Sequence, residues 1–202
     1  MEINHQKADR IKKLGNFDIS LIRKRLLSLN NDEWNAEEDF KLNYNKNNKA
    51  LNQVKHLTLR FIDRQKETYD YLESPRWQQW KTLLFPLMKE IVTTYRYKNP
   101  VFPKVMFANL PSGSFIPPHI DGDKSGYIPH KIHLPILTNK QSYFFLENKR
   151  YHFETGMAYE VNNGLSHAVA NKGVTDRIHL IFECLDYDIQ PKSTQNKMKR
   201  LR

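Results

Sequence analysis

From Lys104 to Leu185, short runs of alternating apolar and polar residues are separated by turn residues, and this pattern limits the fold more than any other feature. Side chains two apart on a strand point to the same face, so a period of two predicts strands with one buried face. We expect seven strands, at residues 104–110, 115–121, 131–137, 143–146, 157–161, 167–171 and 177–185. Short strands at a spacing of about 8–12 residues predict a β-sandwich or jelly roll.

The residues before this region favour helices. Apolar residues at helical spacing predict a short helix at 19–27, and Asp18 is a suitable residue to cap its start. Ser74 and Pro75 form a helix start before a long stripe of apolar and aromatic residues, which we interpret as core. Pro86 inside this stripe predicts a kink or a division into two helices.

The chain of 202 residues suits one domain. Residues 1–100 are expected to form a helical elaboration that packs on the barrel and includes a strand at 57–62. Residues 101–188 are expected to form the β core, which would carry the catalytic site. Residues 189–202 are expected to form a basic, disordered tail, because they contain five Lys or Arg and no acidic residue.

The composition limits the compartment and the partners. The formal net charge is +10, and a short basic tail leaves contact with nucleic acid open, although a solvated chain end is the more common role. No apolar run approaches the roughly 18 residues needed to cross a bilayer, and the first residues lack the apolar core of a signal peptide. The single Cys184 excludes an intrachain disulfide and fits the cytoplasm.

Four residues indicate a metal-dependent oxidation. His119 and Asp121 lie two apart on an expected strand, so both side chains would point to one face. With His167 from a distant strand they give two imidazoles and one carboxylate, the ligand set of non-haem Fe(II) sites that react with dioxygen. Arg177 adds a cation for an anionic co-substrate. Asp123 is a less favoured alternative to Asp121, because a glycine turn separates it from His119.

Five motifs occur in order along the chain. They are Leu-Pro-Ser-Gly-Ser-Phe-Ile-Pro-Pro-His-Ile-Asp at 110–121, Lys-Ile-His-Leu at 131–134, Glu-Thr-Gly-Met-Ala-Tyr-Glu-Val at 154–161, Ser-His-Ala-Val-Ala-Asn at 166–171 and Arg-Ile-His-Leu at 177–180. Together they resemble the aspartyl/asparaginyl β-hydroxylase family of 2-oxoglutarate-dependent oxygenases. The resemblance covers residues 105–185, with a weaker similarity at 17–62.

The resemblance implies a mainly β fold with flanking helices, a double-stranded β-helix of the jelly-roll, cupin-like type. It implies that His119, Asp121 and His167 are the catalytic residues and bind Fe(II), with 2-oxoglutarate as co-substrate and O2 as oxidant. The positions that contact the co-substrate in the family correspond to Arg177, His133, Lys131 and Ser114. Arg177 would pair with the far carboxylate of 2-oxoglutarate, for which its planar guanidinium is suited. His179 is expected to be structural, although it lies two residues from Arg177 on the same strand face, which leaves a role in the pocket open.

Asp121 marks a difference within the resemblance. The membrane-anchored animal enzymes that hydroxylate Asp or Asn have Gly at this position, whereas small microbial members have Asp, and some of these hydroxylate free amino acids such as proline. The expected substrate is therefore an amino acid, or an aspartyl, asparaginyl or prolyl residue in a peptide or protein, and no membrane is expected as a partner.

Two other functions use similar residues. A nucleic-acid demethylase of the same chemistry would usually have a second Arg six residues after Arg177, where this chain has Glu183. A non-oxidative, metal-binding cupin-like protein would use the same barrel and metal without 2-oxoglutarate. Both alternatives stay open at the level of the sequence. The nucleic-acid demethylase fits the sequence less well, because residue 183 is Glu and not Arg.

Overall fold

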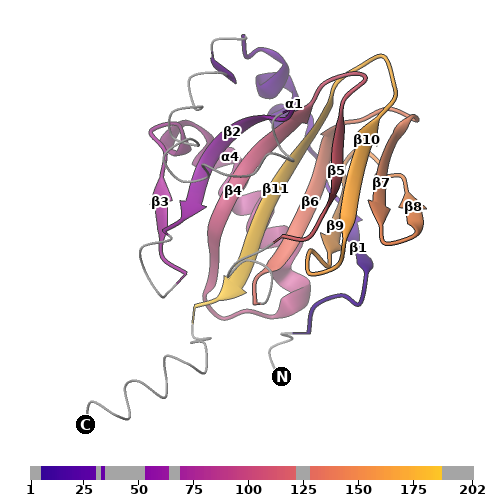
Figure 1. The fold of residues 1–202 in the computed structure, drawn as a ribbon. Helices are drawn as coiled ribbons and strands as arrows, with labels where there is room; N and C mark the ends of the chain where they lie inside the picture. The colour runs from indigo at the N-terminus through magenta and orange to yellow at the C-terminus, as the bar shows by residue number, and fades with distance from the viewer. Residues whose placement is uncertain (1–5, 31–32, 35–52, 64–68, 122–127, 188–202) are drawn as a thin grey trace.

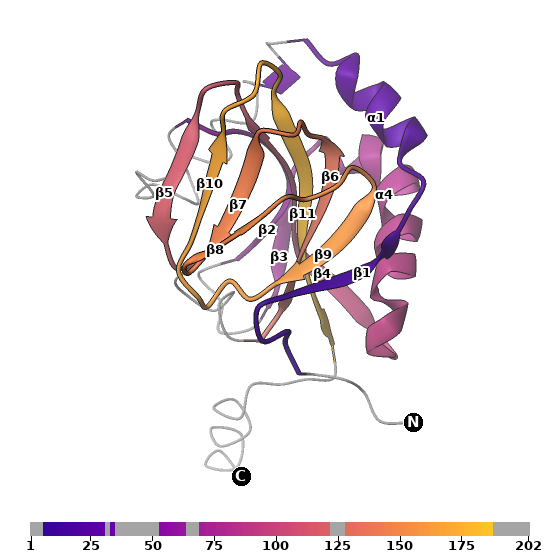
Figure 2. The same ribbon diagram turned by 90° about the vertical axis from the view of Figure 1, so that its right-hand side faces the viewer.

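The computed structural model describes residues 6–30, 33–34, 53–63, 69–121 and 128–187 of the chain. Two antiparallel β-sheets face each other, and the helices α1 and α4 cover the outer face of the larger sheet (Figures 1 and 2). The larger sheet is therefore the middle of three layers and has an apolar interface on each side.

The larger sheet has seven strands in the order β1-β9-β6-β11-β4-β2-β3. Their bounds are Ile11–Asn16 for β1, Lys55–Ile62 for β2, Tyr71–Glu73 for β3, Pro100–Leu110 for β4, His130–Leu137 for β6, Met157–Val161 for β9 and Arg177–Asp186 for β11. The smaller sheet has the order β5-β10-β7-β8, with bounds Phe115–His119, His167–Asn171, Ser142–Leu146 and Lys149–Tyr151. This arrangement is the double-stranded β-helix that the sequence predicts.

All seven strands expected after residue 103 are present, and the strand expected at 57–62 is β2. Strands β1, β3 and β8 do not follow from the sequence pattern. β3 and β8 have only three residues each, too few for alternation to be visible, and β1 contains two adjacent lysines and a glycine. These strands form because β9, β2 and β7 offer them free edges to pair with, a tertiary contribution that local sequence does not contain.

The first helix, α1, spans Ser20–Leu27. Its start lies close to the predicted one, and the carboxylate of Asp18 accepts a hydrogen bond from the N–H of Ser20 at 2.9 Å. Ile22 and Leu26, one turn apart, are the buried residues of the helix. The short helix is therefore held to the larger sheet by one narrow apolar face.

The second helix, α4, spans Trp77–Ile91 and is followed by a 3-10 helix, η2, at Val92–Tyr95. Of the two outcomes expected at Pro86, a kink or a division, the division is wrong, because α4 is continuous through this residue. A proline removes the N–H that would bond to the carbonyl four residues earlier, here that of Thr82. Pro86 and Thr82 both lie on the exposed side of the helix, so the carbonyl left without a helical donor is not buried in the core.

The interpretation of the apolar stripe on α4 as core is confirmed. The buried side chains of the helix are Trp77, Trp80, Leu84, Leu87, Met88 and Ile91. The ring of Trp80 packs on Phe107 of β4, with ring centroids 4.8 Å apart. This interface fixes the outer face of the larger sheet and leaves its inner face toward the smaller sheet.

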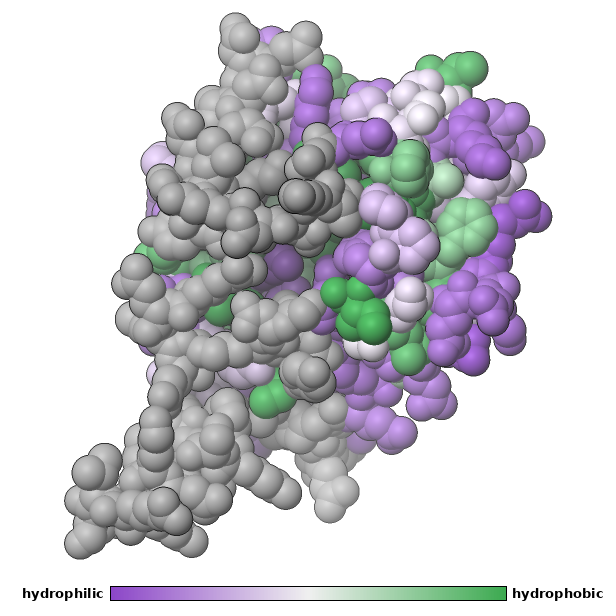
Figure 3. All heavy atoms as spheres, viewed as in Figure 1, coloured by the Kyte–Doolittle hydropathy of each residue, from purple (hydrophilic) through white to green (hydrophobic). Residues whose placement is uncertain are grey.

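The space between the two sheets contains a second apolar cluster. Phe144, Phe153 and Tyr159 form a stack, with ring centroids 5.0 and 4.2 Å apart. On the face seen in Figure 3, hydrophilic residues gather over β7 and β8. None of the helices in the described ranges is long and apolar enough to cross a membrane.

Candidate metal centre

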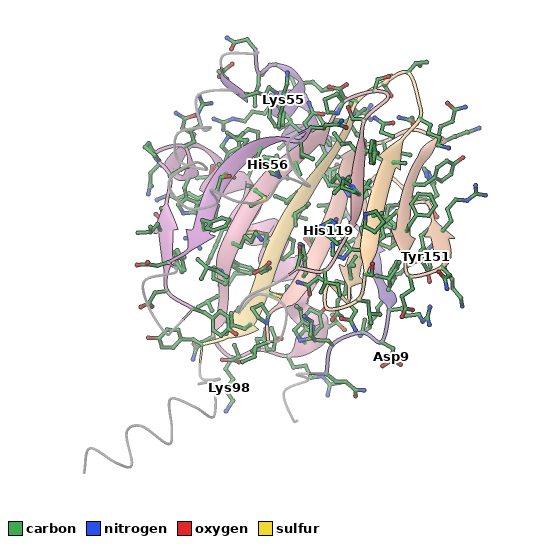
Figure 4. All side chains as sticks on the ribbon, viewed as in Figure 1. Asp9, Lys55, His56, Lys98, His119 and Tyr151 are labelled. Carbon is green, nitrogen blue, oxygen red and sulfur yellow. The ribbon has the colours of Figure 1, made fainter. Side chains whose placement is uncertain are left out.

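The two histidines of the predicted site lie opposite each other on neighbouring strands of the smaller sheet. His119 ends β5 and His167 begins β10, and the antiparallel register pairs them directly. Side chains paired in this way lie on one face of a sheet, and the two ring centroids are 4.3 Å apart. The ring of His167 also stacks on Phe144 of the inter-sheet cluster. Figure 4 labels His119 beside the end of β5, toward the middle of the molecule.

The hydrogen bonds of both imidazoles define which nitrogen faces the site. Nδ1 of His119 bonds to the carbonyl of Pro117 at 2.8 Å, and Nδ1 of His167 bonds to the carbonyl of Leu165 at 2.9 Å. A carbonyl only accepts, so each Nδ1 carries a proton, and Nε2 is the ring nitrogen left to face a metal. The two Nε2 atoms lie 3.8 and 3.9 Å from Oδ1 of Asp121.

The three side chains form a group suited to a metal ion, with ligand atoms all within 4.8 Å of one another. Two imidazoles and one carboxylate fit the two-His-one-carboxylate donor set of non-haem Fe(II). Hydrogen bonds from Nδ1 to backbone carbonyls are the usual means by which proteins orient metal-binding histidines. The residues present therefore fit iron in both ligand type and orientation.

Asp121 uses its two oxygens differently. While Oδ1 faces the imidazoles, Oδ2 accepts a hydrogen bond from the ammonium of Lys131 and a second from Nδ2 of Asn163 at 3.3 Å. Burial alone would raise the pKa of this carboxyl. The positive charges of Lys131 and Lys104, with the hydrogen bond from Lys131, outweigh burial and hold the pKa well below its usual value. Asp121 is therefore ionised, as a metal ligand has to be.

Lys131 belongs to a chain of alternating charges on the inner face of the larger sheet. Burial lowers the pKa of this lysine, but the carboxylates of Asp121 and Glu183 outweigh burial and raise it above the usual value. Glu183 is paired with Lys131 across β6 and β11, is fully buried, and lies 3.4 Å from the ammonium of Lys104. The sequence predicts that Lys131 contacts the co-substrate, whereas in this structure its ammonium contacts Asp121.

Arg177 is buried at the start of β11. It donates a hydrogen bond to Nδ1 of His179 at 2.7 Å, so His179, which the sequence indicated as structural, orients this guanidinium. Burial lowers the pKa of Arg177 to about 9, which leaves it charged at neutral pH. Two acidic residues near it on the chain make other contacts within the described ranges: Asp176 accepts from Asn109 and Ser112, and Glu183 pairs with Lys104.

His133 lies between the metal-binding group and Arg177. Its ring packs edge-on against Phe144 and His179, with centroids 5.7 and 5.9 Å away. Burial, followed by the charges of Lys131 and Arg177, lowers the pKa of His133 well below its usual value. His133 is thus a neutral imidazole in the inter-sheet space.

Ser114 lies in the turn before β5, toward the end of the barrel that contains Arg177. Its carbonyl accepts from Asn171 and its N–H donates to Pro111, so its backbone is anchored. Asp123, the less favoured alternative ligand, lies outside the described residues.

Sequence reasoning missed Asn163, which donates to Asp121. It lies in the Asn-Asn-Gly stretch 162–164, whose composition indicates only a turn. It also missed Lys7, whose ammonium donates to Oδ1 of Asn163 at 2.9 Å. No sequence signal distinguishes Lys7 from its many neighbouring cations.

Comparisons with known proteins agree with this geometry. The sequence model of the Aspartyl/Asparaginyl beta-hydroxylase family matches residues 17–186. No curated protein matches the sequence significantly. An oxidoreductase of the 2OG-Fe(II) oxygenase family from Burkholderia pseudomallei is similar in structure, with a TM-score of 0.54 and 9% identity, over 91% of this chain and 94% of that chain. A prolyl hydroxylase from Trichoplax adhaerens, in complex with a hypoxia inducible factor peptide fragment, also has a TM-score of 0.54, with 13% identity over 89% and 84%.

The structural similarities show the fold, and the sequence match shows the family. The match at 17–186 includes every site residue that the sequence predicts. The chain therefore belongs to the aspartyl/asparaginyl β-hydroxylase family and is an Fe(II)/2-oxoglutarate-dependent oxygenase.

Proposed function

We propose that this oxygenase hydroxylates a C–H bond of an amino acid, or of an aspartyl, asparaginyl or prolyl residue in a peptide or protein. The observation that carries the proposal is the convergence of the Nε2 atoms of His119 and His167 on Oδ1 of Asp121. The buried guanidinium of Arg177, which has no carboxylate partner in the described part of the chain, supports binding of a dicarboxylate co-substrate in the same barrel.

His119, Asp121 and His167 are the proposed ligands of Fe(II). When bound, the iron would supply the oxidation of a substrate C–H bond by O2, coupled to the conversion of 2-oxoglutarate to succinate and CO2. The protein contributes two fixed imidazoles and an ionised carboxylate. It also contributes an apolar inter-sheet space that limits the access of water to the reacting groups.

Arg177 is the proposed anchor for the far carboxylate of 2-oxoglutarate. A guanidinium has five N–H donors, and one of them is used on His179. The others suit a bidentate contact with a carboxylate. His133 is proposed to donate from its neutral ring to the co-substrate, and Ser114 and Lys131 are further candidates for that contact.

The substrate class rests on the family and on the fold. The similar structure from Trichoplax adhaerens contains a peptide, which supports including peptides beside free amino acids. A nucleic-acid demethylase is less consistent, because Glu183 is buried at the position where a second arginine is expected. The basic tail lies outside the described residues. Cytoplasmic localisation stays a prediction from the single cysteine.

Co-substrate binding separates this proposal from a non-oxidative cupin-like protein. The melting temperature is measured anaerobically with Mn(II), and again with Mn(II) and 2-oxoglutarate. Co-substrate at about a hundred times its dissociation constant stabilises the folded state by roughly 2.7 kcal/mol, so a clear increase is expected. An increase with Mn(II) but no further change with 2-oxoglutarate would favour the cupin-like function.

The substrate is then identified by succinate release with Fe(II), 2-oxoglutarate and O2. A panel of free amino acids is compared with peptides that contain Asp, Asn or Pro in their interior. Stimulation by one class above the slow substrate-independent turnover defines the substrate. Absence of both metal binding and succinate release would contradict the proposed function.

A further inference from the structure

The segment before β1 is bonded to the turn that leads to His167. The N–H of Ala8 donates to the side chain of Glu160 at 2.9 Å, and the carbonyl of Arg10 accepts from the N–H of Asn162 at 2.8 Å. The carbonyl of Asp9 accepts from the side chain of Asn162 at 3.1 Å. Figure 4 labels Asp9 where this segment passes near β1. The segment precedes residues 17–186, so the family match does not include it.

Lys7 of this segment reaches the metal centre through Asn163. Its ammonium donates to Oδ1 of Asn163 at 2.9 Å, and Nδ2 of Asn163 donates to Oδ2 of Asp121 at 3.3 Å. An ammonium only donates and a carboxylate only accepts, so the two neighbours determine one orientation of the amide between them. Asn163 is fully buried, and its backbone carbonyl accepts a hydrogen bond from the backbone N–H of Asp121 at 3.2 Å.

We propose that Lys7, through Asn163, positions Asp121 as a metal ligand that uses one oxygen, so that the N-terminal segment is part of the metal centre. The inference rests on the proposed function, because it requires His119, Asp121 and His167 to bind a metal. Lys131 and Asn163 together occupy Oδ2, which leaves Oδ1 to face the two imidazoles. Lys7 and Asn163 are positioning residues.

Electrostatics and positioning predict opposite results for Lys7. A lysine near a divalent cation repels it, so removal of the charge alone would strengthen metal binding. If Lys7 orients the amide of Asn163, its removal frees this amide from its bond to the carboxylate, one of two side-chain donors to Asp121 among the described residues, and weakens metal binding. Loss of a group that orients a metal ligand typically lowers metal affinity by about 10–100-fold.

The test is the dissociation constant of Mn(II) without 2-oxoglutarate, measured by titration calorimetry on the full chain. Asn163→Leu, which is close to the size of Asn, is expected to raise it about tenfold or more. Lys7→Met is expected to raise the Mn(II) dissociation constant by a smaller factor. Lys7→Arg, which keeps a donor, is expected to retain most of the affinity of the unmodified protein. Lys13→Met is the matched control, since it removes an equal charge from the same part of the chain.

Lys13 is suitable because its exposed ammonium pairs only with the exposed Glu154 at 3.3 Å among the described residues. The melting temperature of each metal-free variant is measured in parallel, and if Asn163→Leu does not fold, the Lys7 variants decide. Lys7→Met with an unchanged or lower dissociation constant would overturn the inference, as would equal losses for Lys7→Met and Lys13→Met. If the unmodified protein binds no Mn(II), the proposed function fails first and the inference fails with it.

Discussion

His119 and His167 are direct partners in the antiparallel pairing of β5 and β10, and each presents Nε2 to the same carboxylate oxygen of Asp121. The register of two strands thus brings together residues that are far apart in the sequence. Because Nδ1 of each ring is bonded to a backbone carbonyl two residues earlier, the strands fix the rotation of the rings as well as their position.

Replacement of His119 is expected to abolish function without loss of the fold. His119→Ala removes one of three proposed ligands, so Mn(II) binding and succinate release should both fall below detection. His152→Ala is the control, since His152 is exposed and bonds to the carbonyl of Ser142. Circular dichroism compares the fold of the two variants, and titration calorimetry compares their Mn(II) binding. Mn(II) binding at full affinity by His119→Ala would contradict the assignment of the ligand.

Replacement of Arg177 is expected to affect the co-substrate more than the metal. A hydrogen bond to a charged group contributes about 1.5–3 kcal/mol, so Arg177→Met should raise the KM for 2-oxoglutarate by roughly 10-fold to 150-fold. The Mn(II) dissociation constant should stay within about threefold, because no ligand atom is removed.

Arg150→Met is the control for loss of an arginine. Arg150 is exposed and lies over the ring of Tyr143, with its guanidinium carbon 4.7 Å from the ring centroid. The Arg150→Met variant should leave the KM for 2-oxoglutarate unchanged. Equal KM values for the Arg177 and Arg150 variants would show that Arg177 does not anchor the co-substrate.

The stability of the metal-free protein is expected to fall as the pH decreases from about 6.5 to about 4. Burial, and then the charge of Lys131, lowers the pKa of His167 from 6.5 to about 4. In this window the unfolded chain binds a proton that the folded chain excludes, so stability is present above the unfolded pKa and decreases below it. His133 and His179, also with lowered pKa values, act in the same direction.

The size of the effect of His167 is on the order of 3 kcal/mol. The pKa of Asp121 is lowered from 3.8, so its own contribution is lost only at more acidic pH. Thermal unfolding between pH 4 and 6.5 at constant ionic strength measures the slope, and His167→Gln should reduce it. A melting temperature independent of pH across this window would exclude buried neutral histidines.

Leu84→Ala is expected to destabilise the protein by about 2–5 kcal/mol, because Leu84 is fully buried between α4 and the larger sheet. Leu21→Ala is the matched control, since Leu21 is 67% exposed, and it should change stability by less than about 0.5 kcal/mol. Urea unfolding measures both variants. Similar losses for the two would contradict the role of α4 as the support of the sheet.

Particular residues show how far the sequence reaches. Alternation after residue 103 is a local property, so β4 to β11 were predictable except for β8, and His119, Asp121 and His167 were identifiable by type and spacing. The division expected at Pro86 as one of two outcomes does not occur, because α4 is continuous and this residue lies on its exposed side. β1 and β3 were not predictable because they pair with strands whose free edges exist only in the folded protein.

The sequence by itself determined the strand period, the residue types of the candidate metal centre and the family. These follow from residues that act locally or occur in ordered motifs. Only the tertiary structure decided that Lys131 and Asn163 share one oxygen of Asp121 and that Lys7 holds Asn163. The physical reason is sequence separation: Lys7 and Asn163 are 156 residues apart, and Asn163 and Asp121 are 42 apart. Such contacts exist only after strand pairing has set the register.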